Sequence, residues 1–315
     1  MQADLRLALL YVNILAHGTK TVLVEKVGND LGRTIRSLAL GPSSKFRDTL
    51  AGRKRDIWLT PMCLPDLHDA RKLDLKYRFL RGGLPPFFLS EKFPERDFQE
   101  WMDAYWAKDI QELFRLGRRD SFQRFVELVM VRSGCIFEAT RFAGPCEVSR
   151  PTITNYLRVL EQTYVASVIR PFSTRWPTEI VAAPKVYGFN TGFVSYYRGW
   201  QEVRDEDLGL LWEHFVLNEI QARTQNRNVL YWRDKHGHEV DFVLPELRNQ
   251  PQAIECKWSA NNFDPTNLAA FRRQHPVGEN IVLAHDLQKV FRQSYAGLRV
   301  RFERLETFVS SLQVA

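Results

Sequence analysis

The sequence predicts an α/β protein whose C-terminal part is a mixed sheet flanked by helices. A stretch with an apolar helical stripe, residues 208–220, precedes two stretches, 231–244 and 253–258, in which apolar and polar residues alternate as they do in strands. The remaining elements follow in the order helix, buried strand, edge strand and helix, at 267–273, 280–284, 298–302 and 305–312. Helices and strands in this succession form a sandwich around a mixed sheet.

Composition indicates a soluble protein of more than one domain. With 315 residues, of which 44% are apolar and 26% are charged, the chain can bury two or three cores of ordinary size. Its cysteines, Cys63, Cys135, Cys146 and Cys256, form no C-x-x-C pair, which argues against a zinc ribbon and a secreted disulfide framework. We therefore expect reduced thiols and a cytoplasmic location. A net charge of +7 suits a polyanionic partner, because each phosphate that Lys or Arg neutralises releases counterions.

Residues 1–95 form a mixed segment with few signals. Leu7–Ala16 is too short and too interrupted to span a membrane, which requires about 20 apolar residues, and no basic cluster of a signal peptide precedes it. We expect no membrane partner. Gly82–Pro86 indicates a turn where the chain changes direction.

A helical module follows at residues 96–177. Apolar residues recur at three- and four-residue spacings from Phe98 to Leu116, which predicts a helix with a packed stripe. Further along, 137–142 and 152–161 predict the two helices of a helix-turn-helix, with Ser149 as the N-cap of the second. The buried face of that second helix would consist of Ile153, Tyr156, Leu157 and Leu160.

The outward polar residues of this second helix are candidate nucleic-acid contacts. They are Thr152, Thr154, Asn155 and Arg158. In a DNA-binding helix-turn-helix such residues meet phosphates and base edges in the major groove. The alternative is that this winged-helix-like unit is a spacer or a protein-contact module.

The last segment, residues 178–315, carries candidate catalytic residues. Charged side chains alternate with apolar ones along its first strands, so each strand is expected to turn its acids to one face. Two adjacent strands would then present Asp241, Glu255 and Lys257 to one point. Glu213 lies off the apolar stripe of the preceding helix.

Such a cluster suits Mg²⁺-dependent hydrolysis of a phosphodiester. Hard oxygen ligands hold Mg²⁺, the metal polarises the phosphate and acidifies a water, and an ammonium group offsets developing charge. We assign Asp241 and Glu255 as metal ligands and Glu213 as an outer ligand or water-orienting group. Lys257 would position the water or stabilise the phosphate, and should stay protonated beside the acids. The alternative is a solvated strand face with cross-strand ion pairs.

The order of helix with Glu, strand with Asp and next strand with Glu-x-Lys resembles the PD-(D/E)xK restriction-endonuclease-like superfamily. Phe122–Met130 and Thr152–Phe172 further resemble the middle of a bacterial ATP-binding protein family. In that family an AAA-type ATPase domain precedes a domain of unknown function, number four-one-four-three, in which a winged-helix-like module leads into a nuclease-like module. The resemblance covers residues 38–312, including Ser43–Ser44 and Leu50–Arg53, and implies a DNA-associated protein.

The chain departs from that family in its first segment. A family member carries a P-loop, G-x-x-x-x-G-K-[ST], which cradles nucleotide phosphates. The sequence contains no such motif: Gly18–Thr21 has a Lys-Thr pair without the earlier glycine. ATP is therefore not an expected cofactor, and Gly41–Ser44, which resembles a strand end that senses the γ-phosphate, has nothing to sense. We interpret residues 1–95 as the remnant of an AAA-type ATPase domain in a truncated or degenerate relative.

Two functions are compatible with this pattern. One is a metal-dependent nuclease, and the other is a catalytically inactive DNA- or protein-binding module that keeps the four residues as a relic. Asp241, Glu255 and Lys257 keep the strand positions that such a site requires, which favours the nuclease over the inactive binding module. The sequence leaves open the choice of DNA or RNA and the oligomeric state.

Overall fold

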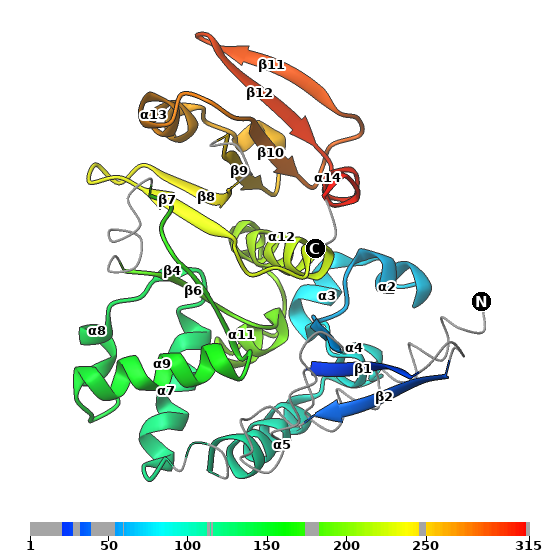
Figure 1. Cartoon of the computed structure of the whole chain (residues 1–315), viewed down its shortest axis with the longest axis vertical. Helices are drawn as coiled ribbons and strands as arrows, with labels where there is room; N and C mark the ends of the chain where they lie inside the picture. Colours follow the sequence, from blue (N-terminus) through cyan, green and yellow to red (C-terminus); the bar gives the residue numbers. More distant parts are fainter. Residues whose placement is uncertain are drawn as a thin grey trace. The chain divides into compact units, whose positions relative to one another are not determined.

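A computed structural model describes residues 21–27, 32–38, 54–58, 60–111, 114, 116–173, 183–245 and 250–312 (Figure 1). The chain divides into two compact units. Unit 1 comprises Met1–Val131, Ala139–Ser167 and Gly188–Gln201, and unit 2 comprises Arg132–Glu138, Val168–Tyr187 and Glu202–Ala315. Several segments singled out in the sequence lie outside the described residues, namely 7–16, 18–20, 41–44 and 50–53.

Unit 1 begins with a three-stranded antiparallel sheet and continues with helices. The sheet has the order β2-β1-β3, from β1 (Thr21–Val27), β2 (Gly32–Leu38) and β3 (Lys54–Trp58). The helices are α2 (Leu64–Asp69), α3 (Leu75–Arg81), α4 (Pro85–Leu89), α5 (Glu95–Tyr105), α7 (Arg119–Val131), α8 (Ala139–Ala143), α9 (Arg150–Gln162) and α11 (Thr191–Tyr197). The helix predicted from Phe98 to Leu116 is α-helical only as far as Tyr105, because the backbone widens there into a π-helix, Trp106–Gln111.

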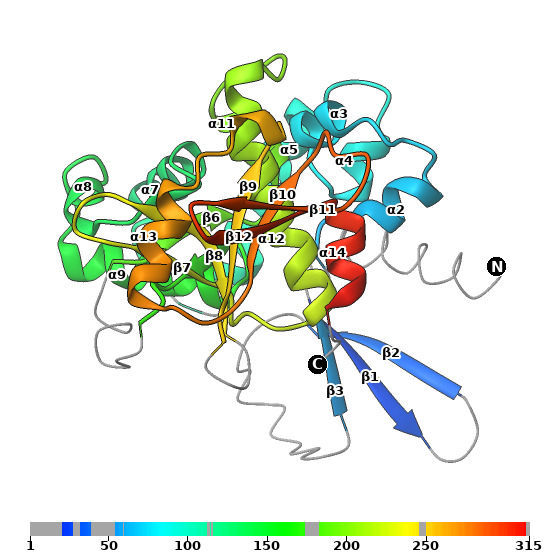
Figure 2. The same cartoon turned by 90° about the horizontal axis from the view of Figure 1, so that it is seen from above.

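The two helices predicted at 137–142 and 152–161 are present as α8 and α9, with α7 beside them (Figure 2). Ser149 is the N-cap of α9, and its Oγ accepts a hydrogen bond from the Thr152 N–H at 3.3 Å. The predicted core face of α9 is buried at Ile153, Tyr156, Leu157 and Leu160. The first helix begins at Ala139, two residues later than predicted.

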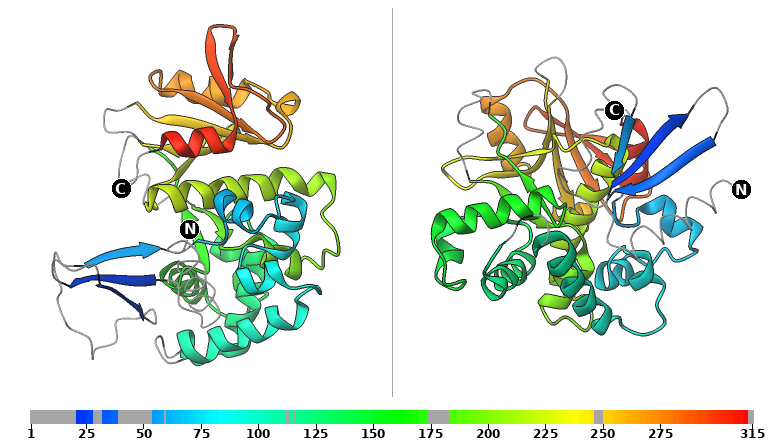
Figure 3. Two further views of the ribbon diagram at one scale, coloured as in Figure 1. Left: turned by 90° about the vertical axis from the view of Figure 1, so that its right-hand side faces the viewer. Right: turned by 60° about the horizontal axis from the view of Figure 1, so that its bottom comes forward.

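Unit 2 is built on a six-stranded mixed sheet with the order β11-β12-β10-β9-β8-β7. Its strands are β7 (Leu230–Arg233), β8 (Glu239–Leu244), β9 (Gln252–Lys257), β10 (Asn280–Ala284), β11 (Phe291–Tyr295) and β12 (Leu298–Glu303). Strands β9, β10 and β12 are parallel, and the other neighbours are antiparallel. Helices α12 (Leu208–Thr224) and α14 (Leu305–Ser311) lie on one face and α13 (Thr266–Gln274) on the other (Figure 3). A smaller sheet has the order β4-β6-β5, from β4 (Cys135–Ile136), β5 (Ala166–Ile169) and β6 (Lys185–Gly188).

The prediction that residues 298–302 form an edge strand is wrong. Strand β12 lies between β10 and β11, and β11 is the edge strand. The turn between them holds Ala296 and Gly297, whose φ angles of 47° and 90° are typical of a two-residue hairpin turn. Four of the five residues of β11 are exposed, so no apolar alternation indicates this strand in the sequence.

Helix α12 is buried on nearly every side, with 11 of its 17 residues inaccessible. The indole Nε1 of Trp212 donates to the Leu283 carbonyl at 3.0 Å, and His214 Nε2 lies 2.9 Å from Ser133 Oγ. These contacts fix the turn of α12 that carries Glu213. The four cysteines are free thiols, as predicted, and no described helix is long and apolar enough to cross a membrane.

Candidate functional site

A β-bulge in the β7–β8 hairpin aims the side chain of Asp241. Leu230 pairs with Val243 but Trp232 pairs with Val240, so two residues of β8 stand opposite one residue of β7. A bulge of this kind redirects a side chain. Val240 and Val243 consequently both belong to the core cluster on the α13 side, and Asp241 turns toward α12 and lines a cavity there.

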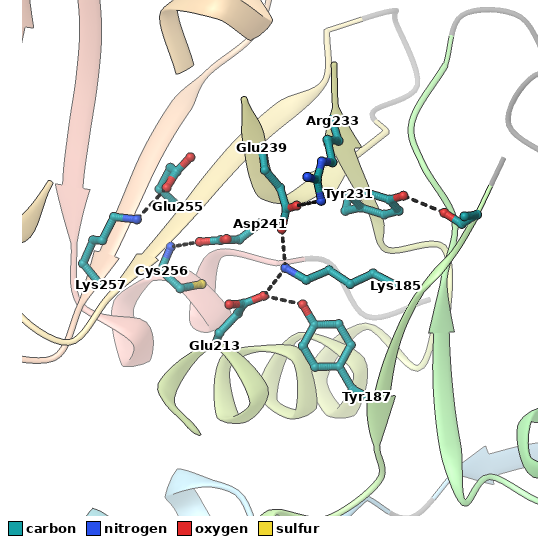
Figure 4. Close-up of polar contacts among 11 residues, drawn as sticks. Lys185, Tyr187, Glu213, Tyr231, Arg233, Glu239, Asp241, Glu255, Cys256 and Lys257 are labelled. Atoms are coloured by element: carbon teal, nitrogen blue, oxygen red, sulfur yellow. Dashed lines mark hydrogen bonds and ion pairs between the residues drawn. The ribbon is translucent and has the colours of Figure 1, made fainter. Parts of the chain in front are cut away.

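Glu255 lies on the opposite face of the sheet. Its Cα partner on β10, Val282, belongs to the cluster beneath α13, so alternation places Glu255 on that face too. The Glu255 side chain is 1% exposed, and its Oε2 accepts a hydrogen bond from Lys257 Nζ at 2.8 Å. The expectation that Asp241 and Glu255 share one face is therefore wrong, because alternation fails at the bulge. Asp241 lies between Glu213 and Glu255 instead (Figure 4).

Two residues that sequence reasoning missed hold Glu213 in place (Figure 4). Lys185, on β6, donates to Glu213 Oε1 and to Glu239 Oε1, each at 2.7 Å. The Tyr187 hydroxyl donates to the same Glu213 oxygen. The Lys185 side chain is only 5% exposed. The one signal in the sequence is a lysine within the apolar run that ends at Phe189, since a lysine is rarely buried unless it is paired.

Burial and crowding raise the pKa values of both glutamates. Burial, and then the neighbouring Asp241, raise the pKa of Glu213 from 4.5 to about 7, although Lys185 lowers it. The same causes raise the pKa of Glu255 from 4.5 to about 8 against the effect of Lys257. Burial by itself lowers the pKa values of Lys185 and Lys257. The neighbouring acidic groups have the larger effect and raise both pKa values above the ordinary value. Lys257 therefore stays protonated, as predicted.

A cavity of about 450 Å³ opens beside Glu213 and Asp241. Its lining includes four acidic residues, Asp205, Glu206, Glu213 and Asp241. Lys257 is the one basic residue among the described residues that line it. The cavity thus combines a surplus of negative charge with one fixed cation.

Each of the three central carboxylates is held through one oxygen. Glu213 uses Oε1 and Glu255 uses Oε2 in the contacts to lysine and tyrosine given above, and Asp241 Oδ2 accepts from the Cys256 N–H at 2.8 Å. Within the part of the chain that the structure describes, the second oxygen of each makes no hydrogen bond, and that of Glu255 is fully buried.

This donor set has the chemistry that a hard cation requires. Carboxylate oxygens are the ligands that Mg²⁺ prefers, and a divalent cation would offset the crowding that raises the two glutamate pKa values. Among the described residues, no three His, Cys, Asp or Glu side chains stand in a ready metal-binding arrangement. A bound cation would therefore require side-chain adjustment around Asp241.

Helix α9 carries the four predicted nucleic-acid contacts. Thr154 and Arg158 are exposed, whereas Thr152 and Asn155 are half-buried. The Thr152 hydroxyl lies 2.8 Å from Ser149 Oγ, and Asn155 Oδ1 accepts from Arg158 at 2.7 Å. Nucleic-acid binding by α9 stays a prediction.

Two protein-family models match the chain. Residues 72–204 match one described as "Domain of unknown function (DUF8612)", and residues 208–299 match one described as "Domain of unknown function (DUF4143)". The second match confirms that part of the resemblance inferred from the sequence.

Two curated mycobacterial proteins are similar to this chain. They are uncharacterized protein Mb2031c of Mycobacterium bovis and uncharacterized protein Rv2008c of Mycobacterium tuberculosis, each 27% identical over 235 residues. The similarity covers 70% of this chain and 52% of each relative, so the chain spans about half the length of the curated relatives that it matches.

Proposed function

We propose that unit 2 carries a Mg²⁺-dependent phosphodiesterase site, on a restriction-endonuclease-like fold, that acts on nucleic acid. One observation carries this proposal. The carboxylates of Glu213, Asp241 and Glu255 are each fixed through one oxygen, and the other oxygen of each forms no hydrogen bond to the described residues. A solvated strand face does not explain this arrangement, because the side chains of Glu213 and Glu255 are only 14% and 1% exposed.

In this proposal Asp241 and Glu255 are metal ligands, and Glu213 is an outer ligand or orients water. Mg²⁺, when bound, supplies a Lewis acid that polarises the phosphate and acidifies a water. Lys185 and Tyr187 hold Glu213 at the cavity wall. Glu213 and Glu255 must be ionised to act as ligands, so their raised pKa values make metal binding compete with protons.

Lys257 is the residue that meets the reacting phosphate. It lines the cavity, and the acids beside it keep its ammonium group protonated. A protonated lysine cannot take a proton from water, so its role is to stabilise negative charge on the phosphate or to position the attacking water.

The wider context of the site belongs to the same proposal. We interpret the chain as a relative of AAA-type ATP-binding proteins, with an ATPase-domain remnant at 1–95, a winged-helix-like module at 96–177 and a nuclease-like domain at 178–315. The polar residues of α9 would add DNA contacts. The proposed reaction uses no ATP.

Cleavage of supercoiled, linear and branched DNA, and of RNA, with Mg²⁺ or Mn²⁺ tests this function. We expect nicking by the parent and a loss of about 100-fold or more in Asp241→Asn and Lys257→Gln, since each removes a group that acts on the reacting phosphate. Glu202→Gln, which removes an exposed acid of unit 2, is the matched control and should cleave like the parent. A parent that binds DNA but cleaves nothing with either metal would favour the catalytically inactive binding module.

A further inference from the structure

A second cavity of unit 2, of about 760 Å³, is lined by arginines. Its lining residues come from the end of α13, the start of β10 and the β11–β12 hairpin. Its described lining residues include one carboxylate, that of Glu279, and five arginines, Arg272, Arg273, Arg292, Arg299 and Arg301. Such a concentration of positive charge in a concave surface attracts anions.

Arg272 builds the wall of this arginine cavity and is not available to a ligand. It is 9% exposed, and its guanidinium donates to Asn280 Oδ1 at 2.6 Å and to the Pro251 carbonyl at 2.9 Å. Carbonyls of the loop after α13 accept its remaining N–H groups, so all five donors are used. Gly278, with a φ of 113°, approaches the Pro251 carbonyl so closely that a side chain would not fit.

Three other arginines of the cavity are free to bind. Arg273, Arg292 and Arg299 are exposed, and none of them forms an ion pair with a described residue. Arg301 forms ion pairs with Glu279 at 3.3 Å and with Glu303 at 3.1 Å. The strand register places Arg292 directly opposite Arg301, so the two cationic groups flank the same part of the cavity.

The two cavities lie at opposite ends of the parallel strands. The arginine cavity includes Asn280 and Leu298, the first residues of β10 and β12, whereas the carboxylate cavity includes Lys257, the last residue of β9. They also lie on different faces of the sheet, since the arginine cavity is lined by residues of α13 and the carboxylate cavity by residues of α12. A single phosphate group therefore cannot occupy both cavities.

We propose that Arg273, Arg292 and Arg299 bind the phosphate backbone of a nucleic acid at the arginine cavity of unit 2. The planar guanidinium group matches two phosphate oxygens at once, which a lysine cannot do. The choice of a nucleic acid as the ligand rests on the function proposed for the carboxylate site.

Salt-dependent binding of a labelled DNA duplex, measured in EDTA by fluorescence anisotropy, tests this proposal. The test variant is the triple substitution Arg273→Gln, Arg292→Gln and Arg299→Gln. Each lost phosphate contact lowers the salt slope by about 0.9, so we expect a slope shallower by about 2.7 and an affinity about 500-fold lower at about 0.1 M salt. The matched control removes the same charge from exposed positions of unit 2 outside the cavity, at Arg223, Lys235 and Lys289.

A far smaller loss in the control triple variant than in the cavity variant would support the proposal. It would be overturned by a parent that does not bind, by unchanged binding in the cavity variant, or by equal losses in both triple variants. Competition identifies the ligand: polyglutamate or inorganic phosphate that displaces the duplex as well as unlabelled DNA does, at equal charge, would overturn the assignment to a nucleic-acid backbone.

A single variant and the use of EDTA keep the result independent of folding and of catalysis. Arg292→Gln should bind about eightfold more weakly at about 0.1 M salt and should melt at the same temperature as the parent, because Arg292 is exposed and forms no ion pair with a described residue. Weaker binding together with a lower melting temperature would point to lost folding and overturn the assignment of Arg292. Binding is measured in EDTA, where no metal-dependent cleavage takes place, so a failure of the arginine cavity is distinguished from a failure of the nuclease.

Discussion

Replacing Glu255 by glutamine is expected to stabilise the protein at pH 8 and to change little at pH 5. The Glu255 side chain is 1% exposed, and burial followed by Asp241 raises its pKa from 4.5 to about 8. An acid whose pKa is higher in the folded than in the unfolded state destabilises the fold increasingly as pH rises from the unfolded to the folded value. Glutamine resembles the protonated acid and can still accept a hydrogen bond from Lys257.

The size of the effect follows from the two pKa values. The difference between 4.5 and about 8, at about 1.36 kcal/mol per pH unit, corresponds to about 5 kcal/mol once the acid is fully ionised. At pH 8, where the folded-state acid is half ionised, the destabilisation is about 4 kcal/mol, and at pH 5 it is about 1 kcal/mol. The advantage of Glu255→Gln over the parent should therefore grow by about 3 kcal/mol between these pH values.

Urea denaturation in EDTA, followed by tryptophan fluorescence from pH 5 to pH 8, measures this difference in the free energy of unfolding. Glu202→Gln is the control, because Glu202 is exposed and its replacement should leave the pH dependence of the parent unchanged. A constant difference between Glu255→Gln and the parent at all pH values, or a parent more stable than the variant at pH 8, would refute the reasoning.

Three further predictions concern the same unit. Mg²⁺ should raise the melting temperature of the parent more at pH 8 than at pH 6, because protons compete for Glu213 and Glu255 below their raised pKa values; equal shifts in thermal melts would contradict this. Lys185→Met should lower the free energy of unfolding by about 3 kcal/mol at pH 8, since Glu213 is left buried without its cation. Adding Glu213→Gln should restore most of that loss in urea denaturation, whereas additive losses would exclude the ion pair as the cause. Ala296→Gly should stabilise the β11–β12 turn by about 1 kcal/mol, because Ala296 has a φ of 47°; a lower unfolding free energy would be inconsistent with a strained turn.

The regular elements of unit 2 are predictable from the sequence because their side chains repeat with the period of the element. Strand β10 is buried at all five positions and reads as a continuous apolar run after Asn280, and β8 alternates from Glu239 to Phe242. Helix α12 shows no clear period, because it is buried on nearly every side. Strand β11 is not predictable in this way, since its residues are mostly exposed and its turn depends on Ala296 in an uncommon backbone conformation.

The site was predictable in its residue types but not in its geometry. Alternation indicates which acids lie on β8 and β9, yet the bulge that turns Asp241 away from Glu255 depends on pairing with β7. The contact of Lys185 with Glu213 joins residues 28 positions apart on different elements. Local sequence patterns do not predict a long-range contact of this kind, so the role of Lys185 is found only from the structure.

Calorimetric titration of Mg²⁺ into the parent at pH 7, in two buffers of different ionisation enthalpy, tests most directly the claim that these carboxylates form a metal-dependent site. Glu213 and Glu255, with pKa values of about 7 and about 8, are half and mostly protonated at that pH. Binding should therefore be saturable, should release roughly one to two protons per ion, and should disappear in Asp241→Asn. No saturable binding by the parent, or the same binding in Asp241→Asn, would contradict the claim.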